Sequence, residues 1–247
     1  MALLLLVAAE GVLHLDSFMH RLRSVFAVGR AFDKVLYVER NPPRMLVLGN
    51  SRMDNGVDPV TLAAPMGFDM TAFNLGLPGA NATTLRGIIG RIDERAGLGA
   101  GRIERVVIGL DEGLLQAGDS LGYEVFFADR PLALDDLSGF ARTHLHLWGY
   151  GANLKQLREP AKLIQFAQAL TAPTEPIGGG AAERLGYRPG FGGAQDAGQV
   201  ASQEAGSTAP PSQQVVADFF AMLDLLRGRG VNVAVVFPPL LTRSVLY

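Results

Sequence analysis

Four apolar runs divide the chain into alternating segments. Three are strong, at 44–50 (RMLVLGN), 105–111 (RVVIGLD) and 231–239 (VNVAVVFPP), and a weaker one lies at 70–76 (MTAFNLG). Valine, isoleucine and leucine follow one another in them without clean alternation, which is typical of strands that helices cover on both faces. The runs therefore predict buried parallel strands.

Helical patterns separate these runs, at 59–66, 82–96 and 212–228. In the second pattern the apolar residues fall on one helical face: Leu85, Ile88, Ile89 and Ile92. Strands that alternate with helices predict an α/β fold, a doubly wound, flavodoxin-like and mainly parallel sheet with helices on both faces. Ligands of such sheets bind at the carboxyl ends of the strands.

The N-terminal segment 1–40 is organised differently. It is apolar from Ala2 to Ala9, meets Glu10, and is apolar again to Leu15, followed by an amphipathic stretch over 16–40. A membrane-spanning helix needs about 20 mainly apolar residues. A signal peptide usually opens with positive residues, and none precede the apolar run here. A membrane or targeting segment and an ordinary buried helix both remain open.

The remaining residues, 41–247, are expected to form the α/β domain. Its pattern decays at about 115–211, which predicts a long irregular insertion. Within it, 173–212 is dense in glycine, alanine, serine and proline and carries no periodic pattern. Long segments of this kind serve either as cover for a site or as plain linker.

Composition excludes several classes of function. A hydrophobic share of 48% against 19% charged residues permits a sizeable core. The formal net charge of −2, without a basic stripe, argues against a nucleic-acid partner. The absence of cysteine excludes disulfides, a thiolate nucleophile and a cysteine zinc site. No dinucleotide fingerprint or phosphate-binding loop follows a strand, so we expect no cofactor.

Each of the first three runs ends in a polar or glycine-rich cluster, and in a doubly wound sheet these ends meet at one crevice. The clusters contain Ser51 in LGNSR, Gly79 and Asn81 in NLGLPGAN, and Asp111 in IGLDEG. A serine at a strand-to-helix turn exposes its hydroxyl, and the glycines allow the backbone to approach a ligand closely. The crevice is therefore the expected site, with Ser51 as its candidate nucleophile.

The charged residues of these clusters have two interpretations each. Arg52 either orients an anionic group through its fork of donors or pairs with Asp54 in the turn. Asp111 and Glu112 form an acid–base pair or a cation site, or they are acidic residues at a helix N-terminus. Asn74 and Asn81 are common turn residues that here lie beside glycines.

The order of these clusters resembles that of the SGNH/GDSL-type hydrolases, and most closely the SGNH-like proteins of bacterial exopolysaccharide and cell-envelope acylation. GNSR matches the nucleophile block, NLGLPGANATTLRGII the block whose glycine N–H joins the oxyanion hole, and GLDEG the third block. The resemblance covers roughly 44–115 and 230–239. It implies an esterase or O-acyltransferase acting on an acylated carbohydrate or small ester, in the periplasm or anchored at the inner membrane. Ser51 is then the nucleophile and Gly79 an oxyanion donor.

Two departures from that pattern keep the function open. Asp111 stands where the family has an asparagine that donates to the oxyanion, and an ionised carboxylate only accepts hydrogen bonds. The family's histidine base follows its last strand, whereas the last histidine of this chain is His146. Either the catalytic end lies beyond this sequence, or the chain is a non-catalytic binding or assembly protein on the same fold.

The internal histidines offer a third source of chemistry. His144 and His146 share one face if the backbone there is extended, so either could act as the base for Ser51. They could also join Asp111 and Glu112 as ligands of a metal-dependent hydrolase, although we expect no metal. The plain interpretation is that both are surface residues beside Trp148 and Tyr150.

Overall fold

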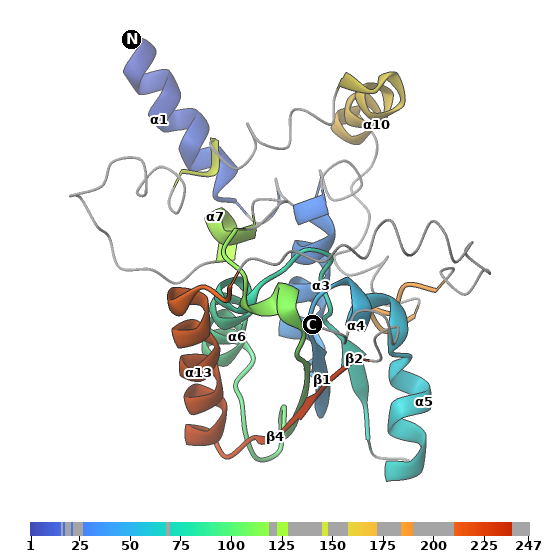
Figure 1. Ribbon diagram of the computed structural model, residues 1–247. Helices are drawn as coiled ribbons and strands as arrows, with labels where there is room; N and C mark the ends of the chain where they lie inside the picture. The colour runs from blue at the N-terminus through green and yellow to red at the C-terminus, as the bar shows by residue number, and fades with distance from the viewer. Residues whose placement is uncertain are drawn as a thin grey trace, which may run out of the picture. The chain divides into compact units, whose positions relative to one another are not determined.

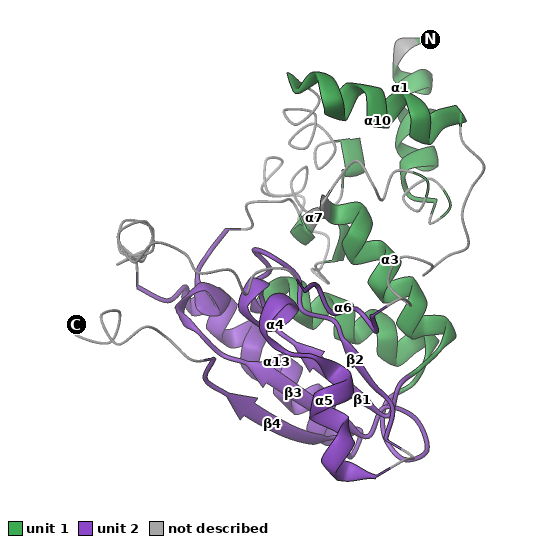
Figure 2. Ribbon diagram, turned by 90° about the vertical axis from the view of Figure 1, so that its right-hand side faces the viewer, with its two compact units in different colours: residues 1–42, 83–97, 119–183 green, residues 43–82, 98–118, 184–247 purple. Residues whose placement is uncertain are grey.

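The computed structural model describes residues 1–15, 17, 21, 27–67, 70–118, 123–127, 145–147, 158–171, 184–189 and 210–238. The chain forms two compact units, coloured separately in Figure 2. We call them the helical unit (Met1–Pro42, Thr83–Gly97 and Asp119–Glu183) and the sheet unit (Pro43–Ala82, Leu98–Gly118 and Arg184–Tyr247). Most of the predicted insertion at 115–211, and part of the amphipathic stretch 16–40, lies outside the described residues.

The sheet unit contains four parallel strands in the order β2-β1-β3-β4 (Figure 1). They are β1 (Met45–Leu48), β2 (Ala72–Asn74), β3 (Arg105–Gly109) and β4 (Asn232–Val236). Each lies inside a predicted run, so the four strands and their parallel pairing are confirmed. The predicted burial is confirmed for β1 and β2 but is wrong for β4, an edge strand whose described residues are largely exposed. The chain steps outward from β1 to β2 and returns past β1 to β3, which makes the carboxyl ends of β1 and β3 the switch point of the sheet.

The helices of the sheet unit lie on both faces of this sheet. They are α4 (Ser51–Gly56), α5 (Pro59–Ala63), the short helices η1 (Ala64–Met66) and η2 (Glu112–Leu115), and α13 (Gln213–Gly228). Helix α5 packs against β2, and α13 packs against β4 and η2. The right-handed rule for parallel crossovers puts α5 and α13 on opposite faces, and Figure 1 shows them on opposite sides of the sheet. The α/β class and the helices predicted at 59–66 and 212–228 are confirmed.

The helical unit holds the other described helices. They are α1 (Ala2–Leu13), α3 (Ala27–Arg40), α6 (Ala82–Arg95), α7 (Tyr123–Phe127) and α10 (Pro160–Thr171). Phe32 of α3 joins three of them, since its ring lies 4.7 Å from that of Phe127 and 5.4 Å below the guanidinium of Arg91. Arg91 and Arg95 of α6 also pair with the half-buried Glu39. The helix predicted at 82–96 is confirmed, with its apolar face fully buried.

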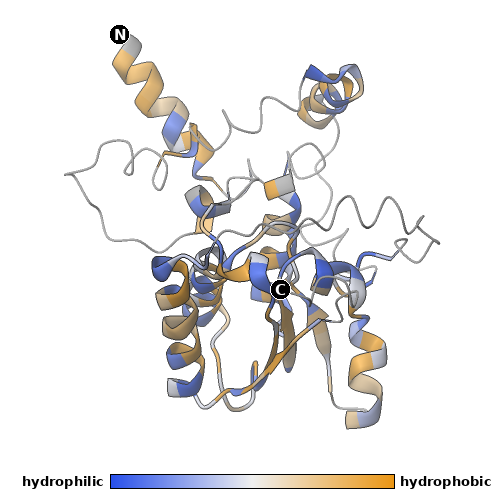
Figure 3. Cartoon of the chain, viewed as in Figure 1, coloured by the Kyte–Doolittle hydropathy of each residue, from blue (hydrophilic) through white to orange (hydrophobic). Residues whose placement is uncertain are grey.

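Helix α1 is apolar from Ala2 to Ala9, and Glu10 is its one charged residue (Figure 3). Its consecutive residues Leu3, Leu4, Leu5 and Leu6 are all exposed. None of the helices in the described part of the chain combines the length and the apolar character needed to cross a membrane.

Candidate functional site

Ser51 lies where the chain leaves the carboxyl end of β1 and enters a helix. It is the first residue of α4, and Asn50 caps that helix by accepting a 3.0 Å hydrogen bond from the Arg52 N–H. Asparagine is among the best N-cap residues because its side-chain oxygen satisfies a backbone donor that the first turn leaves free. The half-buried Ser51 is thus held by the cap that precedes it.

Asn50 also joins the two central strands of the sheet. Its side-chain amide donates to both carboxylate oxygens of Asp111, at 2.7 Å each. Asp111 follows β3 and caps the next short helix by accepting from the Leu114 N–H at 3.0 Å. Hydrogen bonds to a charged group contribute about 1.5–3 kcal/mol. This pair therefore connects the carboxyl ends of β1 and β3 at the switch point.

Arg52 completes the charged group at this edge. Its guanidinium lies 3.3 Å from a carboxylate oxygen of Asp111 and 3.3 Å from one of Glu112. Asp111 is buried, whereas Arg52 and Glu112 are largely exposed, so solvent weakens the second pair more than the first. Of the two predicted uses of Arg52, the structure shows pairing with acidic residues, but they follow β3 rather than lying within the turn.

Asn74 holds the other end of α4. Its side-chain amide donates to the carbonyls of Met53 and Val57, at 2.7 Å each, and its side-chain oxygen accepts from the Gly76 N–H at 2.8 Å. A Cβ on Gly76 would lie 2.8 Å from the Asp54 Cα, which no side-chain rotation relieves. Asn74 therefore positions the helix that carries Ser51, a larger role than the turn residue predicted from the sequence.

Two glycines make room beneath α4. Gly49, with φ +148°, and Gly109 end β1 and β3, and a Cβ on either would collide with the Met53 side chain. Glycine is required here because Met53 of α4 packs directly over both strand ends.

The second glycine cluster contributes one buried and one exposed residue. Gly79 lies in an exposed turn at φ +77°, a conformation that favours glycine. Asn81 is buried, and its side-chain amide donates to the Gln116 carbonyl at 3.3 Å. Asn81 therefore ties this cluster to the segment that follows η2.

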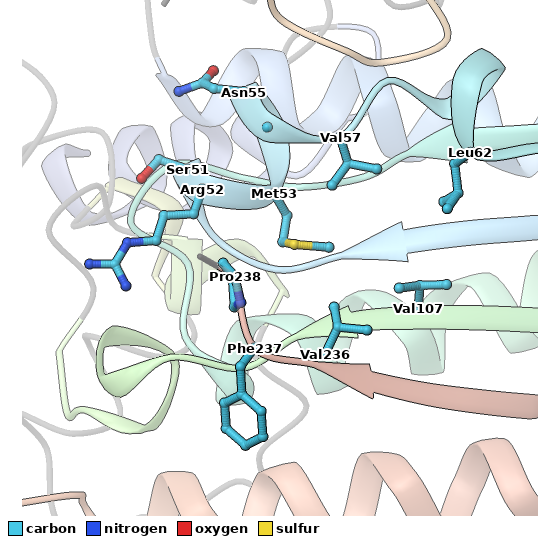
Figure 4. Close-up of a pocket in the computed structure, with 11 residues that line it drawn as sticks. Ser51, Arg52, Met53, Asn55, Val57, Leu62, Val107, Val236, Phe237 and Pro238 are labelled. Carbon is cyan, nitrogen blue, oxygen red and sulfur yellow. The ribbon is translucent and has the colours of Figure 1, made fainter. Parts of the chain in front are cut away.

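A cavity of about 510 Å³ opens beside Ser51 within the sheet unit (Figure 4). Ser51 and Arg52 lie at one end of it, and Leu62 and Val107 at the other. The remaining lining residues are mainly apolar: Met53, Asn55, Gly56, Val57, Val236, Phe237 and Pro238. Its volume lies within the usual range for small-molecule sites of roughly 300–1,000 Å³.

His146 belongs to the helical unit and contacts the N-terminal segment. Its Nδ1 lies 2.9 Å from the Leu13 carbonyl, its ring stacks on His14 at 3.7 Å, and its backbone N–H donates to Glu10. Because a carbonyl only accepts, Nδ1 carries the proton of the neutral ring. Glu10, the charged residue that interrupts the apolar N-terminal run, thus binds the backbone at His146 and Leu147.

Burial lowers the pKa of His146 below its ordinary value of 6.5, and the neighbouring His14 lowers it further. The Leu13 carbonyl and the Glu10 carboxylate act in the opposite direction. His146 is therefore neutral near pH 7, the form that a general base requires. Within the helical unit it contacts Glu10, Leu13 and His14 and the Phe126 ring.

The described residues offer no group of ligands for the predicted metal alternative. Among the described residues, no three histidines, aspartates or glutamates lie together as metal ligands. His144 lies outside the described residues, and so does Trp148.

The sequence interpretation missed Asn50 and the cavity. Asn50 carries a signal, since an asparagine directly before the first residue of a predicted helix is a typical N-cap. The apolar cavity has no such signal in the sequence, because its lining residues Val57, Leu62 and Val236 are brought together only by the folded sheet.

Comparisons of this chain with protein-family models, with curated proteins and with solved structures yield no match.

The two roles of Asn50 can be separated by substitution with aspartate. Asn50→Asp keeps an oxygen to cap α4 but replaces two donated hydrogen bonds by a carboxylate facing Asp111. We expect the free energy of unfolding at pH 7 to fall by about 2 kcal/mol or more, measured by urea denaturation. The reverse exchange Asp58→Asn is the matched control, because Asp58 caps α5 with no such partner. It should change stability by less than about 0.5 kcal/mol, and equal losses in both variants would contradict the assignment.

Proposed function

We propose that this chain is an SGNH-like α/β protein with ester chemistry at Ser51, an esterase or O-acyltransferase for an acylated envelope carbohydrate or a small ester. The observation that carries the proposal is the position of Ser51. It is the first residue of a helix at the carboxyl end of β1, beside the switch point and at the end of a cavity. Doubly wound sheets bind their ligands at this place. The assignment of a carbohydrate as the substrate rests on the resemblance in sequence alone.

In this proposal the Ser51 hydroxyl oxygen bonds to the acyl carbon and the ester C–O bond breaks. The hydroxyl proton passes through a general base to the departing alcohol, and water or an acceptor alcohol then takes the acyl group and returns a proton to Ser51. The backbone N–H groups of Ser51 and Gly79 hold the developing oxyanion. His144 and His146 are the candidate bases within the chain.

The second candidate is a non-catalytic binding or assembly protein on the same fold. It is favoured by the bonding of Asp111, which accepts hydrogen bonds from Asn50 and from the Leu114 N–H and pairs with Arg52. In these contacts Asp111 does not serve as the oxyanion donor that the family places there. Under this candidate the site binds an ester without cleaving it.

The enzyme proposal predicts that a fluorophosphonate probe labels the protein and that Ser51→Ala abolishes the labelling. The physical reason is that a serine hydroxyl reacts with such a probe only when a base activates it. In-gel fluorescence and peptide mapping by mass spectrometry identify the modified residue. Ser212→Ala is the control, since Ser212 precedes α13 and makes no side-chain capping bond. If the wild-type protein is not labelled, the result contradicts the enzyme proposal and favours the non-catalytic binding protein.

We further propose that α1 attaches the protein to a membrane, at the inner membrane or on its periplasmic face. Exposed leucines on every side of α1 suit lipid, whereas docking to a protein groove requires one apolar stripe. Twelve residues at about 1.5 Å each reach about 18 Å. That length corresponds to partial insertion into a hydrocarbon layer of about 30 Å.

Flotation with phosphatidylglycerol–phosphatidylcholine vesicles tests this attachment. We expect the wild-type protein to float with the vesicles and Leu5→Asp to lower the bound fraction more than tenfold, because burying a leucine contributes about 1.5–3 kcal/mol. Val60→Asp on α5 is a matched control, since the two side chains are equally exposed, at 64% for Leu5 and 62% for Val60. Equal flotation of the two variants would refute attachment through α1.

A further inference from the structure

We infer that the cavity beside Ser51 binds the hydrocarbon chain of the substrate's acyl group, so that the preferred ester carries an acyl chain longer than acetyl. This inference rests on the proposed ester chemistry, and it adds the class of acyl group to it.

The walls of the cavity are apolar and face one another. Val57 and Leu62 point toward Val107 and Val236 from the opposite side of the cavity (Figure 4). These residues come from the segment after α4, from α5, and from two neighbouring strands. Between these four side chains a sugar would lose its hydrogen bonds to water without replacement, whereas a hydrocarbon chain loses nothing polar. The cavity therefore selects the acyl part of an ester rather than its carbohydrate part.

The inner wall of the cavity is part of the core. Leu62 and Val107 pack against a buried cluster formed by Met45, Ala63 and Ala72. Close-packed surroundings keep such side chains in place. The wall is therefore formed before a ligand arrives, which favours binding because little order has to be created on association.

The polar end of the cavity favours a neutral ester over a free acid. Arg52 contributes one positive charge there, and its partners Asp111 and Glu112 contribute two negative charges. The group as a whole is thus negative by one charge. A carboxylate product experiences repulsion that an uncharged ester does not, so the same charges that hold the turn also favour release of an acid product.

Binding of methyl esters to the Ser51→Ala protein tests the inference without turnover. Dissociation constants are measured by ligand-observed NMR for methyl propanoate, butanoate, pentanoate and hexanoate. We expect affinity to rise roughly fourfold with each added methylene, the value that corresponds to burial of one methylene group. Wild-type protein is assayed separately for kcat/KM on nitrophenyl esters of the same acyl groups.

Two substitutions locate the chain in this cavity. Leu62→Trp and Val236→Phe, on different elements, each fill part of it and should flatten the affinity series. Val60→Trp, two residues before Leu62 on α5 and exposed, should leave the series unchanged. Far-ultraviolet circular dichroism and urea unfolding identify any variant that fails to fold. If one cavity-filling variant fails, the affinity series of the other tests the location of the acyl chain.

The outcomes separate this inference from the proposed function. A rising series that both filling variants flatten supports the acyl cavity, even if wild-type Ser51 proves unreactive and the protein only binds esters. A flat series overturns the inference even if Ser51 reacts with the probe, and is also the result expected if another stretch of polypeptide occupies the cavity. A rising series that neither filling variant changes overturns it as well, because the chain then binds elsewhere.

Discussion

The hydrogen-bonded pair of Asn50 and Asp111 is the constraint on which the candidate site depends. Parallel strands β1 and β3 are joined along their length by backbone bonds, but beyond their ends the chain diverges into α4 and η2. The Asn50 amide bridges this divergence by donating to both oxygens of Asp111. Each residue also caps the helix that follows it. This half-buried contact thus links the starts of both helices, and with them the position of Ser51.

The surroundings of Ser51 divide into a charged side and an apolar side. On the charged side, Arg52 is paired with Asp111 and Glu112, which leaves a negative balance at the mouth of the site. On the apolar side, valine and leucine side chains line the cavity. This division suits an amphiphilic neutral ligand, with its polar group at the strand ends and its hydrocarbon part over the sheet.

The sequence predicted the four strands because they lie in unbroken apolar runs, most clearly at 105–111 and 231–239. The same runs predicted burial, which β1 shows at every position and β4 does not. The position of Ser51 after β1 followed from the same pattern. Other features depend on three-dimensional pairing: nothing near Asn74 in the chain indicates that its amide holds two carbonyls of α4. Nor could spacing reveal that His146 stacks on His14, 132 positions earlier.

A double-mutant cycle on Asn50→Ala and Asp111→Ala tests the central claim most directly. The free energies of unfolding of the wild type, the two single variants and the double variant are measured by urea denaturation at pH 7. The account predicts a coupling energy of about 1.5–3 kcal/mol between the two sites, as expected for hydrogen bonds to a charged group. Effects that add to within about 0.5 kcal/mol would show that the two residues act independently. Ser51 would then owe its position to the rest of α4 rather than to this pair.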